Sequence, residues 1–181
     1  MSGSEEGEEA VPDDVSDDVS ADVPWLDVRE MRAWLRLVAV LELLPGTLDA
    51  QLRRDAAMTH FDYMVVSQLS EAPGRTLRMT ALAQRTNATL PRLSHVVRRL
   101  EERGLVERAP SPEDRRATDA RLTDAGLAAV VDAAPGHVRA VREHVVDALS
   151  SEQVEQLAEI AEALLRRLDP DGRMTDLYDP A

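Results

Sequence analysis

Apolar residues recur at intervals of three and four along most of the chain. From Leu26 this spacing marks one face of an amphipathic helix, which we expect Pro45 and Gly46 to bend or interrupt. A second helix is predicted over about residues 60–70. The apolar stripe of the first helix consists of Met31, Trp34, Leu35, Val38, Leu41, Leu44 and Leu48. The spacing therefore predicts a helix-rich protein.

The C-terminal third continues the helical spacing. Thr123 is placed to cap a long helix, which Pro135 and Gly136 should kink. Ser150 and Gln153 have the spacing of a capping box for the last helix. The long helix should carry Leu127, Val130, Val131, Val138, Val141, Val145 and Leu149, and the last helix should bury Val154, Leu157, Ile160, Ala161, Leu164 and Leu168.

The middle of the chain breaks this pattern into short elements. Thr80 and Thr89 are each placed to cap a short helix, and Gly104 ends the second of them. Two strands follow, Leu105–Ala109 and Ala117–Leu122, joined by the polar turn PSPEDR. The buried face of the second helix should be Leu93, Val96, Val97 and Leu100. These elements predict a winged helix-turn-helix within a mostly α (α+β) fold.

Composition excludes several classes of protein. The 181 residues are 44% hydrophobic, which suits one domain of ordinary size, and only 3% aromatic, which favours helices over a sandwich. Because there is no cysteine, disulfides, thiolate zinc sites and thiol-based redox sensing are excluded. The chain shows no targeting or membrane-spanning segment, so we expect a soluble, cytoplasmic protein with no membrane partner.

Charge is distributed unevenly along the chain. The net charge of −13 disfavours nucleic acid, but residues 75–121 hold eleven arginines against six acids. Residues 1–24 hold nine acids and no base. We interpret this segment as a disordered acidic tail. The alternatives are an autoinhibitory mimic of DNA and a segment that recruits a partner. The local basic island is what contact with double-stranded DNA requires.

The second helix of the winged module and its hairpin carry the candidate DNA contacts. Its outer face presents Arg92, Ser94 and His95 near the start, where side chains reach bases in the major groove. Further along, the helix offers side chains that can contact phosphates, and the alternative for this helix is a solvated charged face. The arginines of the hairpin tip can enter a minor groove, and the alternative for Asp114 is an ordinary turn aspartate. The remaining candidates are Thr89, Arg98, Arg99, Asp114, Arg115 and Arg116.

The segment MTALAQRTNATLPRLSHVVRRLEERGLVERAPSPEDRRATDARLTDAG resembles the central module of the MarR family of bacterial transcription regulators. The most specific pieces are VVRRLEERGLVER, the EDRRA hairpin tip and LTDAG, in register. The chain departs from the pattern at the start of the second helix, where it has Leu90 and Pro91 in place of serine or arginine. Base preference therefore cannot be transferred from relatives.

The resemblance implies a homodimer that binds a pseudo-palindromic operator, with half-sites about one DNA turn apart. It implies dimerisation through Leu26–Gln51 and Val138–Leu168, a wing contact by Arg116, and Asp114 as the acid that orients this arginine. The domain plan is an acidic tail (1–24), an N-terminal dimerisation helix (25–58), the winged DNA-binding domain (59–122) and C-terminal dimerisation helices (123–181). Neither the operator, the regulated genes nor the sign of regulation follows, although a repressor is the expectation.

The resemblance also implies a small aromatic effector, for which Trp34, Arg54, His60 and Tyr63 are candidate lining residues. Trp34 could instead be a core residue and His60 could simply start a helix. A regulator that needs no ligand, or a winged-helix module that binds an acidic protein, are the alternative functions.

No enzyme motif is present: the chain lacks a Gly-rich phosphate loop, HExxH, GxSxG and a paired-carboxylate site. His137 and His144 could share a helix face, but two histidines without a clear third ligand favour a solvated surface over zinc. We expect neither catalysis nor a metal or other cofactor.

Overall fold

The computed structural model describes residues 23–112 and 114–174. Its contacts divide the chain into two compact units, residues 1–40 and 41–181, and helix α1 (Val28–Ala56) runs from the first into the second. Nearly all of the acidic tail expected over residues 1–24 lies outside the described residues.

In the N-terminal unit, the described residues form the first half of α1 and a short segment before it. Asp27 caps this helix, because its Oδ1 accepts hydrogen bonds from the backbone N–H groups of Arg29 and Glu30 at 2.6 and 2.9 Å. Trp34 is 51% exposed, so the alternative that it is a core residue is wrong. The apolar side chains exposed on this half of the helix also include Val28, Met31, Leu35, Leu37 and Val40.

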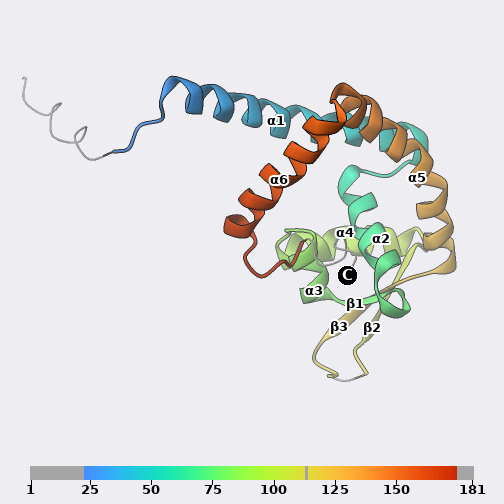
Figure 1. Ribbon diagram of the computed structural model, residues 1–181. Helices are drawn as coiled ribbons and strands as arrows, with labels where there is room; N and C mark the ends of the chain where they lie inside the picture. Colours follow the sequence, from blue (N-terminus) through green and yellow to red (C-terminus); the bar gives the residue numbers. More distant parts are fainter. Residues whose placement is uncertain (1–22, 113, 175–181) are drawn as a thin grey trace, which may run out of the picture. The chain divides into compact units, whose positions relative to one another are not determined.

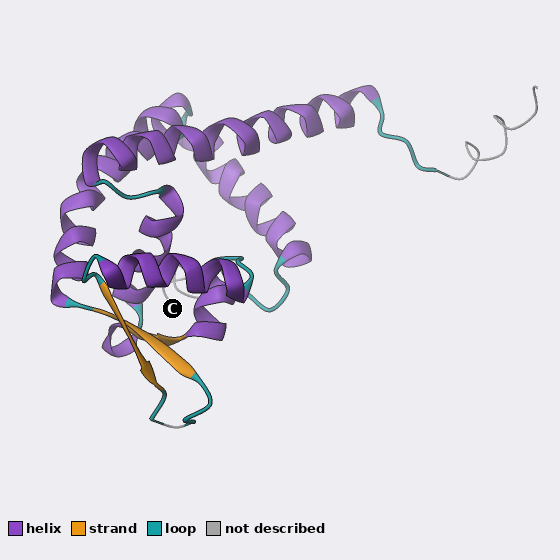
Figure 2. Ribbon diagram, turned by 180° about the vertical axis from the view of Figure 1, so that it is seen from behind, coloured by secondary structure: helices purple, strands orange, loops and turns teal. Residues whose placement is uncertain are grey.

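A winged helix-turn-helix forms the centre of the second unit, as predicted (Figure 1). Its helices are α2 (His60–Glu71), α3 (Met79–Arg85) and α4 (Leu90–Glu102). Its strands are β1 (Thr76–Arg78), β2 (Val106–Pro110) and β3 (Thr118–Leu122). They form an antiparallel sheet in the order β1-β3-β2, and the β2–β3 hairpin extends away from the helices as the wing (Figure 2).

The core of this unit is almost entirely aliphatic. Leu93, Val97 and Leu100 of α4 are fully buried and Val96 is 6% exposed, which confirms the predicted inner face of that helix. Around it pack Leu52, Val65, Val66, Leu69, Leu82, Val106 and Leu122 from α1, α2, α3, β2 and β3. Burial of these side chains fixes the orientation of α4, so its opposite face is held toward solvent.

Helix α5 (Asp124–His144) begins in direct contact with the chain segment that follows α4. Thr123 caps α5 by accepting a hydrogen bond from the backbone N–H of Gly126 at 3.0 Å, and its own N–H donates to the carbonyl of Leu105 at 3.1 Å. A Cβ on Gly126 would lie 2.1 Å from that carbonyl oxygen and 2.6 Å from Cδ1 of Leu122. Only glycine fits here, which explains the glycine of LTDAG.

The start of α3 differs from the prediction. Arg78 is the N-cap residue and Met79 begins the helix, so Thr80 does not cap it. The reason is β1, which pairs with β3 so that Leu77 lies opposite Ala120, and whose extended backbone leads directly into α3. This three-residue strand was not predicted, because an alternating pattern cannot show over so few positions.

The two long helices, α1 and α5, also differ from the prediction. Helix α1 continues through Pro45, and α5 continues through Pro135. Because α5 ends at His144 and a 3-10 turn η2 (Val146–Ala148) follows, Val145 and Leu149 lie outside the helix in which they were expected.

Helix α6 (Ser151–Leu168) starts at the predicted capping box. The Ser150 hydroxyl accepts from the backbone N–H of Gln153 at 3.2 Å, and the Gln153 side chain accepts from the N–H of Ser150 at 2.9 Å. The prediction that α6 buries its apolar face is wrong for the described chain, since those side chains are exposed: Val154 38%, Leu157 45%, Ile160 58%, Leu164 41% and Leu168 79%. In the described ranges, no helix has the length and apolar character needed to cross a membrane.

Candidate nucleic-acid interface

Helix α4 presents a polar face opposite its buried one. Thr89 caps the helix by accepting a hydrogen bond from the backbone N–H of Arg92 at 3.4 Å, and Pro91 stands in the first turn, where no N–H is needed. His95 and Arg98 lie at the centre of the exposed face. This capped, amphipathic helix has the form that enters a DNA major groove.

The centre of this face holds one internal contact. Nη2 of Arg98 lies 3.0 Å from Nδ1 of His95. Because a guanidinium can only donate, Nδ1 must accept, and the neutral ring then carries its proton on Nε2. His95 is therefore set up as a hydrogen-bond donor.

One flank of α4 faces the first turn of α2. The guanidinium of Arg92 lies 4.3 Å from the centre of the Phe61 ring, a cation–π contact. Arg99 pairs through Nη2 with Asp62, whose side chain is only 3% exposed. Asp62 also accepts the N–H of Thr59 at 2.9 Å in the capping box of α2. Arg99 therefore joins α4 to α2, and its outer part remains exposed.

The other flank of α4 faces the wing. Arg108 of β2 donates to Glu101 through Nη2 at 2.6 Å and through Nε at 3.0 Å. These hydrogen bonds hold the pKa of the Glu101 carboxyl below its usual range. Between this flank and the wing lies a groove of about 230 Å³ lined by Arg78, Met79, Thr80, Leu90, Ser94, Arg108, Arg116, Ala117 and Thr118. The candidate residues Ser94 and Arg116 thus come together in one groove.

At the wing tip, Asp114 acts on the backbone. Its Oδ1 accepts the N–H of Arg116 at 3.0 Å, and its carbonyl accepts the N–H of Ala117 at 2.8 Å. Asp114 is therefore an ordinary turn aspartate, the alternative to an orienting acid. It holds the backbone of the loop and not the Arg116 guanidinium. Arg115 and Arg116 are exposed.

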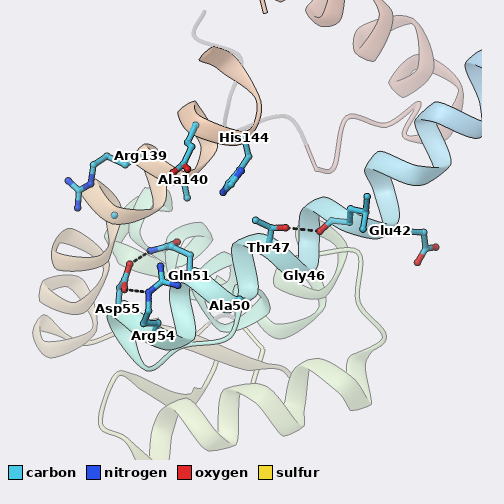
Figure 3. Close-up of a pocket in the computed structure, with 13 residues that line it drawn as sticks. Glu42, Gly46, Thr47, Ala50, Gln51, Arg54, Asp55, Arg139, Ala140 and His144 are labelled. Carbon is cyan, nitrogen blue, oxygen red and sulfur yellow. Dashed lines mark hydrogen bonds and ion pairs between the residues drawn. The ribbon is translucent and has the colours of Figure 1, made fainter. Parts of the chain in front are cut away.

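The candidate effector residues do not form one site in the second unit. Arg54 lines a cavity of about 740 Å³ between α1 and α5 (Figure 3). Gln51 is 6% exposed there, and its Oε1 has no hydrogen-bond partner, while its Nε2 donates to Asp55 at 3.0 Å. Gly136 lies against this amide, where a Cβ would come within 3.1 Å of Nε2. Gln51, Arg54 and Asp55 together make the lining of this cavity polar.

His60 and Tyr63 instead meet His137 of α5, at 6.0 and 4.6 Å between ring centres. Burial lowers the pKa of both histidines, and the neighbouring His60 lowers that of His137 further, so both rings are neutral at pH 7. His144 lines the cavity of Arg54, so the two histidines weighed for zinc face different surroundings. The fourth candidate, Trp34, belongs to the N-terminal unit.

Sequence reasoning missed the residues that hold the interface together. Phe61 and Asp62 of α2 contact the candidate residues Arg92 and Arg99, and Arg108 of β2 pairs with Glu101 of α4. Arg53 of α1 was also missed, although it lines the same groove as Arg92.

Comparisons with known proteins agree with this geometry. A protein-family model described as MarR family matches residues 58–117. The structure of Sco3205, a MarR family transcriptional regulator from Streptomyces coelicolor in complex with DNA, is similar with a TM-score of 0.77 and 44% identity, covering 81% of this chain and 95% of that one. AbsC, a MarR family transcriptional regulator from the same species, has a TM-score of 0.76 and 35% identity, covering 81% and 98%.

Among curated proteins, the HTH-type transcriptional regulator MhqR of Bacillus subtilis (strain 168) is 37% identical over 68 residues, which is 38% of this chain and 46% of MhqR. The chain spans about half the length of the curated relatives it matches.

Proposed function

The chain belongs to the MarR family of transcription regulators, and from this premise we propose that it represses transcription by binding a pseudo-palindromic DNA operator as a homodimer. The proposal rests on the outward face of α4. Arginines stand on both flanks of this face, and burial of the opposite face keeps it turned toward solvent. The relative Sco3205 was crystallised with DNA, which supports the choice of partner.

We divide the side chains of α4 into base contacts and phosphate contacts by their position on the helix. His95, Arg98 and Ser94 lie at the centre and on the wing side of the exposed face, so we assign them to base edges. Arg92 was predicted from the sequence to read bases, but because it stacks on Phe61 at a flank of the helix, we now propose that it contacts phosphate. Arg115 and Arg116 are assigned to a minor groove beside each half-site.

A dimer would supply the cover that α6 lacks. A side chain such as Ile160 is 58% exposed in the single chain, and the same face carries four further exposed apolar residues. Contiguous apolar surface of this kind marks a protein interface. We therefore assign this face of α6 to a second copy of the chain.

The cavity between α1 and α5 is our candidate effector site. Its lining sets two arginines beside three carboxylates and adds the Gln51 amide, so it offers hydrogen-bond donors and acceptors to a small polar ligand. Salicylate would serve as a probe: it should raise the melting temperature of the wild type more than that of Gln51→Leu. An equal shift in both would remove the cavity from consideration and favour a ligand-independent regulator.

We further propose that the protein has no catalytic activity and acts in the cytoplasm, where its DNA target lies. The relatives it matches are transcription regulators, which supports the non-enzymatic role.

Selection of bound duplexes from a random DNA pool tests the proposed function. The wild type should enrich a pseudo-palindromic sequence, and His95→Ala should lose about tenfold of the preference at one position of each half-site. His144→Ala is the matched control, because it removes the same side chain from the cavity of α1 and α5. If no sequence is enriched, the function is instead that of a protein-interaction module.

A further inference from the structure

Arg53, near the C-terminal end of α1, faces the DNA-reading helix from outside the winged module. It lines two adjoining grooves along the α2 side of α4, of about 530 and 430 Å³. Thr59 and Arg99 line both, so they form one continuous surface, which we call the α2-side groove. Its cationic residues are Arg53, Arg92, Arg99 and Arg103, and His95 also lines it.

We propose that the α2-side groove binds the phosphates of one DNA strand and that Arg53 is one of the contacts, which extends the DNA interface onto α1. The proposal rests on the proposed function, because it requires α4 to lie in the major groove. A helix in that groove has a phosphate strand along each flank. The wing side already has Arg78 and Arg108 for one strand, and the α2-side groove is the corresponding surface for the other.

The position of Arg53 is fixed before DNA arrives. Its Nε donates to Oδ2 of Asp49 at 2.5 Å, and Oδ1 of Asp49 accepts the backbone N–H of His60 at 2.9 Å. Asp49 is thus held at the start of α2 and holds Arg53 in turn. Only Nε is used in this contact, so both terminal nitrogens of Arg53 can donate to a phosphate. An arginine fixed in this way loses little side-chain entropy on binding.

The groove keeps positive charge after its internal pairs are formed. Its two carboxylates, Asp49 and Asp62, are each paired with one arginine, Arg53 and Arg99. Arg92 rests on an aromatic ring, and Arg103 completes the end of the groove. Four arginines against two acids leave an excess of cations, which suits a run of phosphates.

Arg142 of α5 provides a matched control. Arg53 and Arg142 are both exposed, at 62% and 58%, and each pairs with an aspartate. Arg142 lines neither the α2-side groove nor the α1–α5 cavity. Replacement of either residue by alanine removes one positive charge, so the two variants differ in location and not in net charge.

The test is a salt titration of binding to the selected operator by Arg53→Ala and Arg142→Ala, with thermal melts to confirm folding. Each lost phosphate contact flattens the slope of log K against log salt by about 0.9 and weakens binding about fivefold at 0.15 M salt, so a dimer losing two contacts should bind about 30-fold more weakly. We expect this for Arg53→Ala alone, with unchanged sequence preference, and recovery of the slope in Arg53→Lys.

Three results would overturn the proposal in different ways. If the wild type binds its operator and Arg53→Ala matches Arg142→Ala, the Arg53 contact is excluded and the proposed function stands. If Arg53→Ala binds DNA normally but loses binding to polyglutamate, the groove serves an acidic protein. If the wild type selects no DNA sequence, the proposed function fails together with this inference.

Discussion

Helices α4 and α6 carry the same apolar spacing but differ in what covers it. In α4, Leu93, Val97 and Leu100 are fully buried against the rest of the winged domain. In α6, Ile160 and Leu168 are 58% and 79% exposed in the single chain. The spacing thus identifies an apolar face in both helices without saying whether the same chain covers it. In α4 the buried face supports the opposite surface that we assign to DNA, and in α6 we assign the apolar face to a second protomer.

The largest effect on stability should come from a change on the buried face of α4. Leu100→Ala should lower the free energy of unfolding by about 2–5 kcal/mol, because it leaves a cavity in a well-packed core. Urea denaturation at fixed protein concentration measures this. Glu102→Ala, on the exposed side of the same helix, should change the value by less than about 0.5 kcal/mol. Equal losses in the two variants would show that α4 is not held by its apolar face.

A change on the exposed apolar face of α6 should have a smaller effect on the stability of the single chain but a large effect on dimer formation. Ile160→Glu should weaken self-association by on the order of 100-fold or more, since each copy loses a buried apolar side chain at the interface. Sedimentation equilibrium measures the association constant, and Glu159→Gln on the same helix is the control. An unchanged dimer would mean that a different surface joins the protomers.

The smallest effect concerns the start of α6. Ser150→Ala removes one half of the capping box and should lower stability by about 1 kcal/mol. The melting temperature of the dimer is the measurement. No change there, with loss of helical signal at low temperature, would indicate that α6 folds independently of the core.

Local signals in the sequence were sufficient for most of the fold. The caps at Thr89, Thr123 and Ser150 are hydrogen bonds between neighbours in sequence, and all three are confirmed. Strand β1 was missed, because it depends on pairing with β3, which is distant in sequence. The predicted burial of α6 was wrong, because no other part of the described chain covers its apolar face. Periodicity describes one segment at a time, so it cannot supply either.

The candidate site shows the same division. The apolar spacing of α4 and the turn pattern of the wing predicted which side chains face outward. They did not predict which other residues hold those side chains in place. Arg92 stacks on Phe61, which is 31 residues earlier, and Arg99 pairs with Asp62 over a similar separation. Asp114 acts through the backbone of Arg116, and a sequence cannot distinguish this from a contact with the side chain.

We propose that α4 lies in the major groove at two half-sites, and methylation protection on the selected operator probes that groove. Dimethyl sulfate attacks N7 of guanine, an atom that faces the major groove. Bound protein should protect guanines in two clusters whose centres lie about 10 base pairs apart, one helical turn. If guanines stay as reactive as in free DNA on a duplex fully occupied by protein, α4 does not lie in the major groove.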